Sequence, residues 1–251
     1  MDDTSRDRLR IEPGAKRVRV YVGGELLADT VRPLYVWEVP YYPAYYLPIE
    51  DVRMELLTPT GNTKHSPSRG EGTFFAVKGG GHVAADAALQ YADSPIEELR
   101  DHVRFDWDVV DAVFEEDEQV FVHPRDPYHR VDILHGSRHV EVLADGVKVA
   151  ETTRPTILYE TGLPARYYIP QPDVRMDLLD PTESQTGCPY KGFARYWNVR
   201  TGDTIHEDLA WSYRTPLPES QKIAGLVAFY NERVDLVVDG ERLERPQTPF
   251  S

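Results

Sequence analysis

The sequence contains very little cysteine and little positive charge, and both shortages exclude classes of protein. Its 251 residues include one cysteine, Cys188, which can form neither an internal disulfide nor a multi-cysteine zinc site. Lysine and arginine number 28 against 42 aspartates and glutamates, so the net charge is −14. Nucleic acids and anionic membranes are bound mainly by clustered basic side chains. We therefore expect neither of them as a partner.

Long apolar runs and cofactor motifs are missing as well. No stretch approaches the roughly 20 apolar residues that span a bilayer. The first ten residues, MDDTSRDRLR, lack the apolar segment of a secretory signal, so we expect a cytoplasmic acidic protein. Residues 79–81, Gly-Gly-Gly, lack the Gly-Lys-Ser/Thr ending of a phosphate loop, and the histidines show no zinc-ligand spacing. We expect no metal and no cofactor.

The chain does contain an internal repeat. A shift of 122 positions places DVRMDLL, residues 173–179, on DVRMELL, residues 51–57, and Glu160 on Glu38. Each copy has about 120 residues, a usual size for one domain. We predict two tandem domains, residues 1–130 and 131–251, which form an intramolecular pseudo-dimer.

Apolar residues within each copy recur mostly at every second position. Val18, Val20 and Val22 precede a Gly-Gly turn, and HVEVLADGVKVAE repeats this pattern around an Asp-Gly turn, as β-hairpins do. We also interpret DVRMELL and DVRMDLL as strands, and only residues 219–225 as helical. Many short strands predict two all-β, antiparallel, sandwich-like domains with little helix.

Together, the motifs YYIP, DVRMDLL, TGCPYKG, AWSY and VDLVVDGE resemble domain of unknown function 427, here in tandem over nearly the whole chain. This family is similar in fold to the β-tent proteins, which include methionine sulfoxide reductase B and the thalidomide-binding domain of cereblon. The resemblance therefore implies two β-tent domains. An alternative family name refers to nucleotidyltransferases, but no established activity follows from it.

The clearest difference between the copies is in the segment TGCPYKG. Cys188, Tyr190 and Lys191 stand where the first copy has Ser66, Ser68 and Arg69. A lysine three residues after a cysteine in a turn favours a reactive thiolate, whereas a lone cysteine is more often a small buried side chain. Any thiol chemistry belongs to the second copy, and the first is interpreted as a degenerate scaffold.

Two further sets of side chains complete the candidate site. Glu160 and Tyr168 are candidate proton donors beside the catalytic candidates Cys188 and Lys191. The candidate ligand-binding residues are Arg175, Tyr190, Trp197, Trp211 and Tyr213. For Arg175 a structural ion pair with Asp173 or a stack on a tyrosine is favoured over ligand binding, whereas the aromatic rings fit core packing and a pocket about equally.

Three functions remain open from the sequence. One is an enzyme that acts on a small molecule through Cys188, and another is a binding protein for a nucleoside-like or aromatic ligand. The third is nucleotidyl transfer, which needs clustered carboxylates for magnesium, here Asp203, Glu207 and Asp208.

Overall fold

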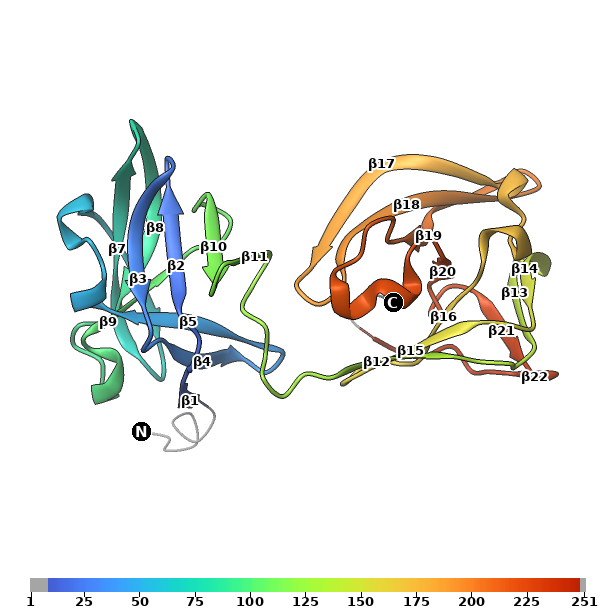
Figure 1. Ribbon diagram of the computed structural model, residues 1–251, viewed down its shortest axis with the longest axis horizontal. Coiled ribbons are helices and arrows are strands. Elements are labelled where there is room, and N and C mark those ends of the chain that lie inside the picture. Colours follow the sequence, from blue (N-terminus) through green and yellow to red (C-terminus); the bar gives the residue numbers. More distant parts are fainter. Residues whose placement is uncertain (1–8, 249–251) are drawn as a thin grey trace. The chain divides into compact units, whose positions relative to one another are not determined.

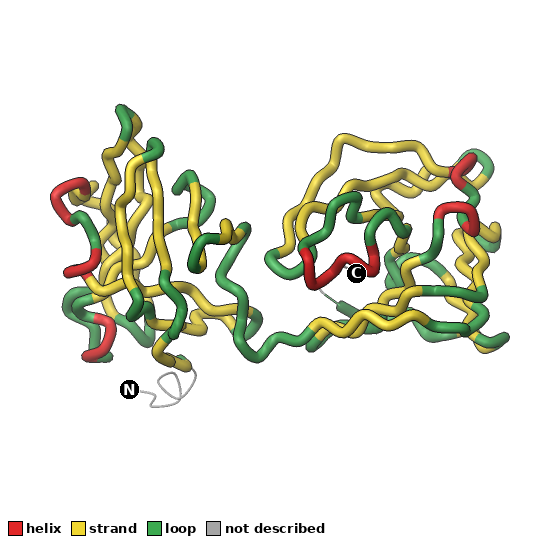
Figure 2. Tube along the Cα trace, in the orientation of Figure 1, coloured by secondary structure: helices red, strands yellow, loops and turns green. Residues whose placement is uncertain are grey.

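The computed structural model describes residues 9–248, and the chain divides into two units, residues 1–126 and 127–251 (Figure 1). The division falls a few residues before the boundary that the repeat predicts. Strands make up most of both units, and the described helices are short 3-10 turns (Figure 2). The predicted all-β fold with little helix is confirmed.

The first unit consists of two antiparallel sheets. A seven-stranded sheet has the order β1-β4-β5-β9-β8-β7-β6, and a four-stranded sheet has the order β11-β10-β2-β3. Three 3-10 turns, η2 (Ile49–Asp51), η3 (Met54–Leu56) and η4 (Glu97–Leu99), connect the strands. The strands are β1 (Arg10–Pro13), β2 (Val18–Val22), β3 (Glu25–Thr30), β4 (Leu34–Val39), β5 (Tyr42–Pro48), β6 (Leu57–Ser66), β7 (Gly70–Gly79), β8 (His82–Gln90), β9 (His102–Phe105), β10 (Ala112–Glu115) and β11 (Glu118–Val120).

The second unit repeats this arrangement. Its small sheet has the order β14-β13-β21-β22, and its large sheet consists of β12-β15-β16 and β20-β19-β18-β17. The 3-10 turns are η5 (Gln171–Asp173), η6 (Met176–Leu178) and η7 (Pro218–Ile223). The strands are β12 (Val131–His135), β13 (Val140–Ala144), β14 (Val147–Thr152), β15 (Thr156–Glu160), β16 (Arg166–Tyr168), β17 (Leu179–Cys188), β18 (Gly192–Thr201), β19 (Thr204–Ser212), β20 (Val227–Phe229), β21 (Asp235–Val238) and β22 (Glu241–Arg242).

The two parts of the large sheet in the second unit meet at Ile169 and Val227. Each of these residues donates its backbone N–H to the carbonyl of the other, over 2.8 and 2.9 Å. In the first unit, Leu47 and Val103 are paired at the same place between β5 and β9. The seven strands of each large sheet therefore follow one order in both units.

Each large sheet buries both of its faces. In the second unit one face packs against the small sheet, with Val142, Ile169 and Leu236 in this core. The other face carries a second core that includes Tyr168, Trp211 and Ile223, the last from η7. Burial on two faces explains why the strands of the large sheet are richer in aromatic residues than a half-exposed sheet requires.

The hairpins that the sequence predicts are confirmed, whereas the two strands predicted at DVRMELL and DVRMDLL are wrong, since η2 ends and η3 lies in the first of these segments. β2 and β3 are paired around Gly23 and Gly24, as expected. DVRMDLL instead forms the turns η5 and η6, in which Asp173 and Leu178 donate their N–H groups to carbonyls three residues earlier. Pro172, inside η5, has no N–H to donate to a strand partner. The alternation of apolar residues there imitates a strand.

Within residues 9–248, the helices are too short and too polar to cross a bilayer.

Candidate functional site

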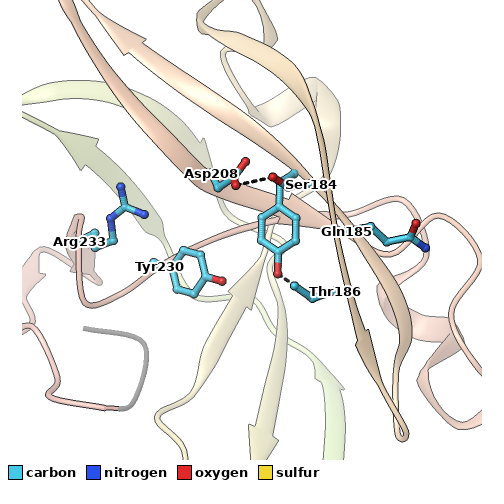
Figure 3. A pocket seen from close by; sticks show the side chains of 7 residues that line it. Ser184, Gln185, Thr186, Asp208, Tyr230 and Arg233 are labelled. Carbon is cyan, nitrogen blue, oxygen red and sulfur yellow. Dashed lines mark hydrogen bonds between the residues drawn. The ribbon is translucent and has the colours of Figure 1, made fainter. Parts of the chain in front are cut away.

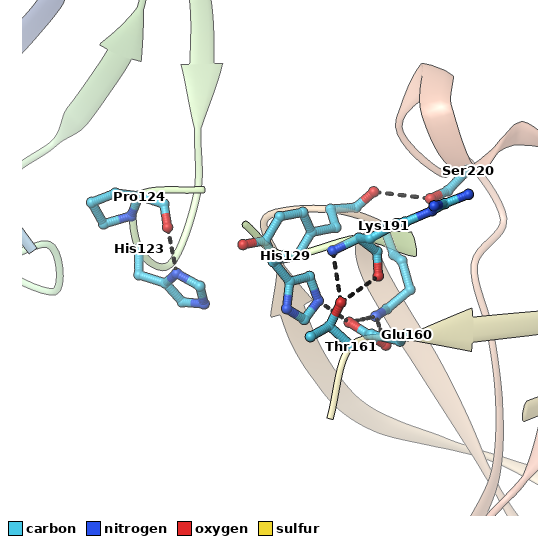
Figure 4. Close-up of polar contacts among 9 residues, drawn as sticks. His123, Pro124, His129, Glu160, Thr161, Lys191 and Ser220 are labelled. Atoms are coloured by element: carbon cyan, nitrogen blue, oxygen red, sulfur yellow. Dashed lines mark hydrogen bonds and ion pairs between the residues drawn. The ribbon is translucent and has the colours of Figure 1, made fainter. Parts of the chain in front are cut away.

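Glu160 and Lys191, two of the predicted catalytic residues, form a buried ion pair in the second unit. Glu160 is the last residue of β15, and Lys191 belongs to the turn between β17 and β18. The Lys191 ammonium lies 2.6 and 2.5 Å from the two carboxylate oxygens, and His129 Nε2 is 3.0 Å from one of them (Figure 4). One carboxylate thus lies between two basic side chains.

Burial and the two basic groups act in opposite directions on the Glu160 carboxyl. Burial alone raises its pKa, because a charged carboxylate loses hydration there. Hydrogen bonds and charge from His129 and Lys191 outweigh burial, so the pKa of Glu160 lies below its usual value. Glu160 is therefore a charged partner rather than a proton donor near neutral pH, which does not favour the general-acid role that the sequence suggested.

Cys188, Tyr168 and Tyr213 lie close to this ion pair. Tyr168 is 1% exposed, and its hydroxyl accepts a hydrogen bond from Trp211 Nε1 over 3.2 Å. Burial, reinforced by the nearby Cys188 thiol and Glu160 carboxylate, raises the pKa of Tyr213. Cys188 is half-buried at the end of β17. The structure thus gathers six of the predicted residues near one another: Glu160, Tyr168, Cys188, Lys191, Trp211 and Tyr213.

The remaining predicted residues have different surroundings. Tyr190 stacks on the ring of His129, with ring centres 4.3 Å apart. Trp197 is buried in the core between the two sheets, away from the cluster that holds Trp211. Arg175 is exposed between η5 and η6, where it pairs with Asp177 and not with Asp173. The structure does not bring Arg175 and Trp197 to the side chains around Cys188.

The first unit contains a counterpart of this cluster. Glu38 contacts Arg69 at 2.7 Å and Arg104 at 3.1 Å, and Tyr46 donates its hydroxyl hydrogen to Glu38. The strand register places Arg104 opposite Leu89, where the second unit has Ala228 opposite Trp211. A buried glutamate with a basic partner is therefore common to both copies, and its first role is to stabilise the fold.

An open pocket lies on the second unit. Residues of β17, β18 and β19 and of the turn that follows β20 line it. Its volume is about 440 Å³, which is in the range for small-molecule sites (Figure 3). The lining residues are Ser184, Gln185, Thr186, Tyr196, Asp208, Tyr230 and Arg233. Thr186 Oγ1 and the Tyr196 hydroxyl are 2.7 Å apart, so hydroxyl groups form one side of the pocket.

Asp208 is held in this pocket by hydroxyl groups. Its two carboxylate oxygens accept hydrogen bonds from Thr182 and Ser184, over 2.7 and 2.6 Å, and its φ is 47°. Aspartate tolerates this left-handed conformation better than most residues. Asp86 in the first unit has a φ of 51° and accepts hydrogen bonds from the Thr60 hydroxyl and the Asn62 amide, so the conformation of this residue belongs to the fold.

Two anchors hold the turn that carries Tyr230 and Arg233. Asn231 donates to the carbonyl of Ala165 over 2.8 Å, and Glu232 accepts two hydrogen bonds from Arg166 over 2.6 and 2.7 Å. The side chains of Arg166 and Glu232 are 6% and 0% exposed. The guanidinium of Arg166 also lies over the ring of Tyr230. This clamp fixes the side of the pocket that faces β19.

Sequence reasoning missed His129 and most of the pocket. In the repeat, Tyr230 and Arg233 correspond to Asp106 and Val109, since Arg233 and Val109 donate to the carbonyls of Tyr230 and Asp106 in equivalent turns. These differences between the copies are the signal that was available. They lie in a stretch where the two copies are 124 positions apart instead of 122, so the hydrogen bonds of the turns, and not the simple shift, align them.

The acids proposed for magnesium do not form a cluster. Within residues 9–248, the one group of at least three histidine, cysteine or acidic ligand atoms within 4.8 Å consists of His139, Glu141 and Glu151. There the Lys148 ammonium lies 2.5 Å from Glu141 and 2.8 Å from Glu151, so it already neutralises them. Neither group supports nucleotidyl transfer.

Comparison with known proteins identifies a family. The model of a family described as a domain of unknown function (DUF427, NTP_transf_9) matches residues 10–116 and again residues 132–240. No curated protein matches the chain. The predicted tandem resemblance is confirmed, and the chain belongs to the DUF427 family, with two copies of its domain.

Proposed function

We propose that the second unit binds a small molecule in the pocket that Tyr196 and Tyr230 line. The observation that carries this proposal is the open volume of about 440 Å³ lined by hydroxyl groups, an aspartate and an arginine. Small-ligand sites typically combine such a volume with a few polar groups that orient the ligand. The proposal keeps the small-ligand function suggested by the sequence but places the ligand among other residues.

The first unit supports this assignment because it carries different side chains at the same places. Its counterparts of Ser184, Thr186 and Tyr196 are Asn62, Lys64 and Phe74. Arg233 is replaced by Val109, as the equivalent turns indicate. The identity of the side chains in the pocket, with hydroxyl groups and an arginine, therefore distinguishes the second copy, whereas the strands around it are shared.

The test compares the wild-type chain with a variant that carries first-copy residues in the pocket. Ser184→Asn, Thr186→Lys and Arg233→Val introduce side chains that the same fold accommodates in its other copy. A library of small polar molecules is screened against both by thermal shift and calorimetry. We expect hits that bind the wild type and lose binding to the triple variant. Hits that bind both proteins equally would overturn the assignment of the pocket.

Cys188 chemistry is a second candidate function. The observation that favours it is the proximity of the Cys188 sulfur to Tyr168 and Tyr213, whose pKa values are raised mainly by burial and to a smaller extent by Cys188. Against it, the Lys191 ammonium is held by Glu160, and no hydrogen bond joins it to the thiol in the described part of the chain. The pocket therefore remains the first candidate.

A further inference from the structure

The pocket holds one positive and one negative side chain, and neither has an oppositely charged partner among the residues that the structure describes. Arg233 is exposed and forms no ion pair with a residue in the range 9–248. The Asp208 carboxylate accepts hydrogen bonds from two hydroxyl groups, and no basic side chain within that range forms an ion pair with it. Both residues line the same pocket without contacting each other (Figure 3).

This pair of charges selects among ligands by simple electrostatics. An anion is attracted by Arg233 but repelled by Asp208, and a cation experiences the reverse. A molecule with both charges gains at both positions, since each of its groups meets an opposite charge. Each Asp208 oxygen accepts one hydrogen bond in the structure and retains a lone pair for an ammonium donor.

The rings of the pocket add a second requirement. Tyr230 lies between Arg233 and Thr186 in the view of the pocket (Figure 3). Trp211 supports it from behind, with ring centres 4.5 Å apart, and Arg166 lies over the same ring. A ring held in this way is a rigid surface for an apolar or aromatic group.

We propose that the ligand of this pocket is a small zwitterion of the amino-acid type, with its carboxylate on Arg233, its ammonium on Asp208 and an apolar or aromatic side group beside Tyr230. This inference rests on the proposed function, because it requires that the pocket binds a ligand. It extends that function by naming the chemical class. The first unit, with Asp106 and Val109 in place of Tyr230 and Arg233, lacks two of the three elements.

The test uses the full chain and three probes of similar size. Phenylalanine carries both charges, phenethylamine lacks the carboxylate, and 3-phenylpropionate lacks the ammonium. We expect calorimetry to give phenylalanine a Kd at least about tenfold lower than either analogue, as expected for one charge-assisted hydrogen bond.

Two variants assign each charge to its residue. In Arg233→Ala, phenylalanine and phenethylamine should bind equally, because the partner of the carboxylate is gone. In Asp208→Asn, phenylalanine and 3-phenylpropionate should bind equally. Asparagine tolerates the left-handed conformation, and Asp86→Asn makes the same change in the first unit as the matched control. That control should keep the full preference for phenylalanine.

The outcomes separate this inference from the proposed function. If an analogue with one charge binds the wild type as tightly as phenylalanine, the zwitterion is wrong, although the pocket still stands if the triple variant loses that binding. If none of the three probes binds, the ligand class is overturned, and the proposed function depends on the wider screen. Selective loss of one preference in each variant supports the assignment.

Discussion

The Lys191 ammonium and the Glu160 carboxylate form an ion pair whose side chains are only 10% and 8% exposed. In the first unit, Arg69 and Glu38 form the corresponding pair, with 10% and 14% exposure. Removal of one partner from a buried pair leaves an uncompensated charge, which costs far more than the loss of a surface pair. Both units therefore depend on this contact for stability.

Lys191→Met should lower the free energy of unfolding by about 3–5 kcal/mol, because Glu160 is then buried with only His129 as a basic partner. Lys191→Arg imitates Arg69 and should recover most of the loss. Urea unfolding of the full chain measures both changes. A stability of Lys191→Met equal to that of the wild type would show that the pair contributes nothing.

Acid should remove the contribution of Glu160. The folded pKa of this carboxyl is below the value of 4.5 for an unperturbed glutamate. Its stabilising effect is therefore complete above about pH 4.5 and is lost as the pH falls through the folded pKa. The difference in free energy of unfolding between wild type and Glu160→Gln should accordingly shrink below pH 4.5.

Glu183→Gln, at an exposed position of β17 without an ion pair to residues 9–248, is the control for this experiment. Its stability should differ little from that of the wild type at any of these pH values. If the difference in free energy of unfolding between wild type and Glu160→Gln stays constant down to pH 3, on the order of 1.5 units below the reference pKa, Glu160 does not stabilise the fold through its charge.

The sequence predicts the class of the fold well because the repeat and the period of two are strong local signals. Val18, Val20 and Val22 alternate, and glycines stand where the hairpin needs a positive φ. DVRMDLL was misjudged because alternation also occurs in successive 3-10 turns when one face packs on a core. Local pattern alone does not report where the hydrogen bonds go.

The site was predictable only in part. Glu160 and Tyr168 were found because Glu38 and Tyr46 stand at the matching positions of the first copy, and Lys191 because it follows the only cysteine by three residues. The pocket depends on Asn231 and Glu232, which fix a turn through contacts 66 residues away in the sequence with Ala165 and Arg166. Such long-range contacts leave no periodic trace in the sequence.

Glu232→Gln should destabilise the chain by about 3–5 kcal/mol, because it leaves the Arg166 guanidinium buried without a carboxylate. It should also loosen the turn that holds Tyr230 and so weaken ligand binding. Asp108→Asn, at the corresponding exposed position of the first unit, should change neither property. Unfolding in urea and calorimetry test the two effects. If both variants keep the stability and ligand binding of the wild type, the contact between Arg166 and Glu232 does not hold the turn.

Cys188→Ser should preserve both stability and ligand binding, since Ser66 occupies the same position in the first unit. The stability change should stay within about 1.5 kcal/mol, the usual limit for a volume-conserving substitution. The rate of alkylation of the native chain against pH completes the test, because the chain has one cysteine. Rapid alkylation at neutral pH, together with loss of binding in Cys188→Ser, would instead support thiol chemistry.

The four tryptophans of the chain give the most direct test of whether a ligand enters the pocket of the second unit. Trp211 contacts Tyr230, Trp197 lies in the other core of the same unit, and Trp37 and Trp107 belong to the first unit. Hits from the screen are titrated into the ¹⁵N-labelled chain while the indole N–H signals are followed. We expect a saturable shift of the Trp211 signal, with the Trp37 and Trp107 signals unchanged. Shifts confined to the first unit would contradict binding in this pocket.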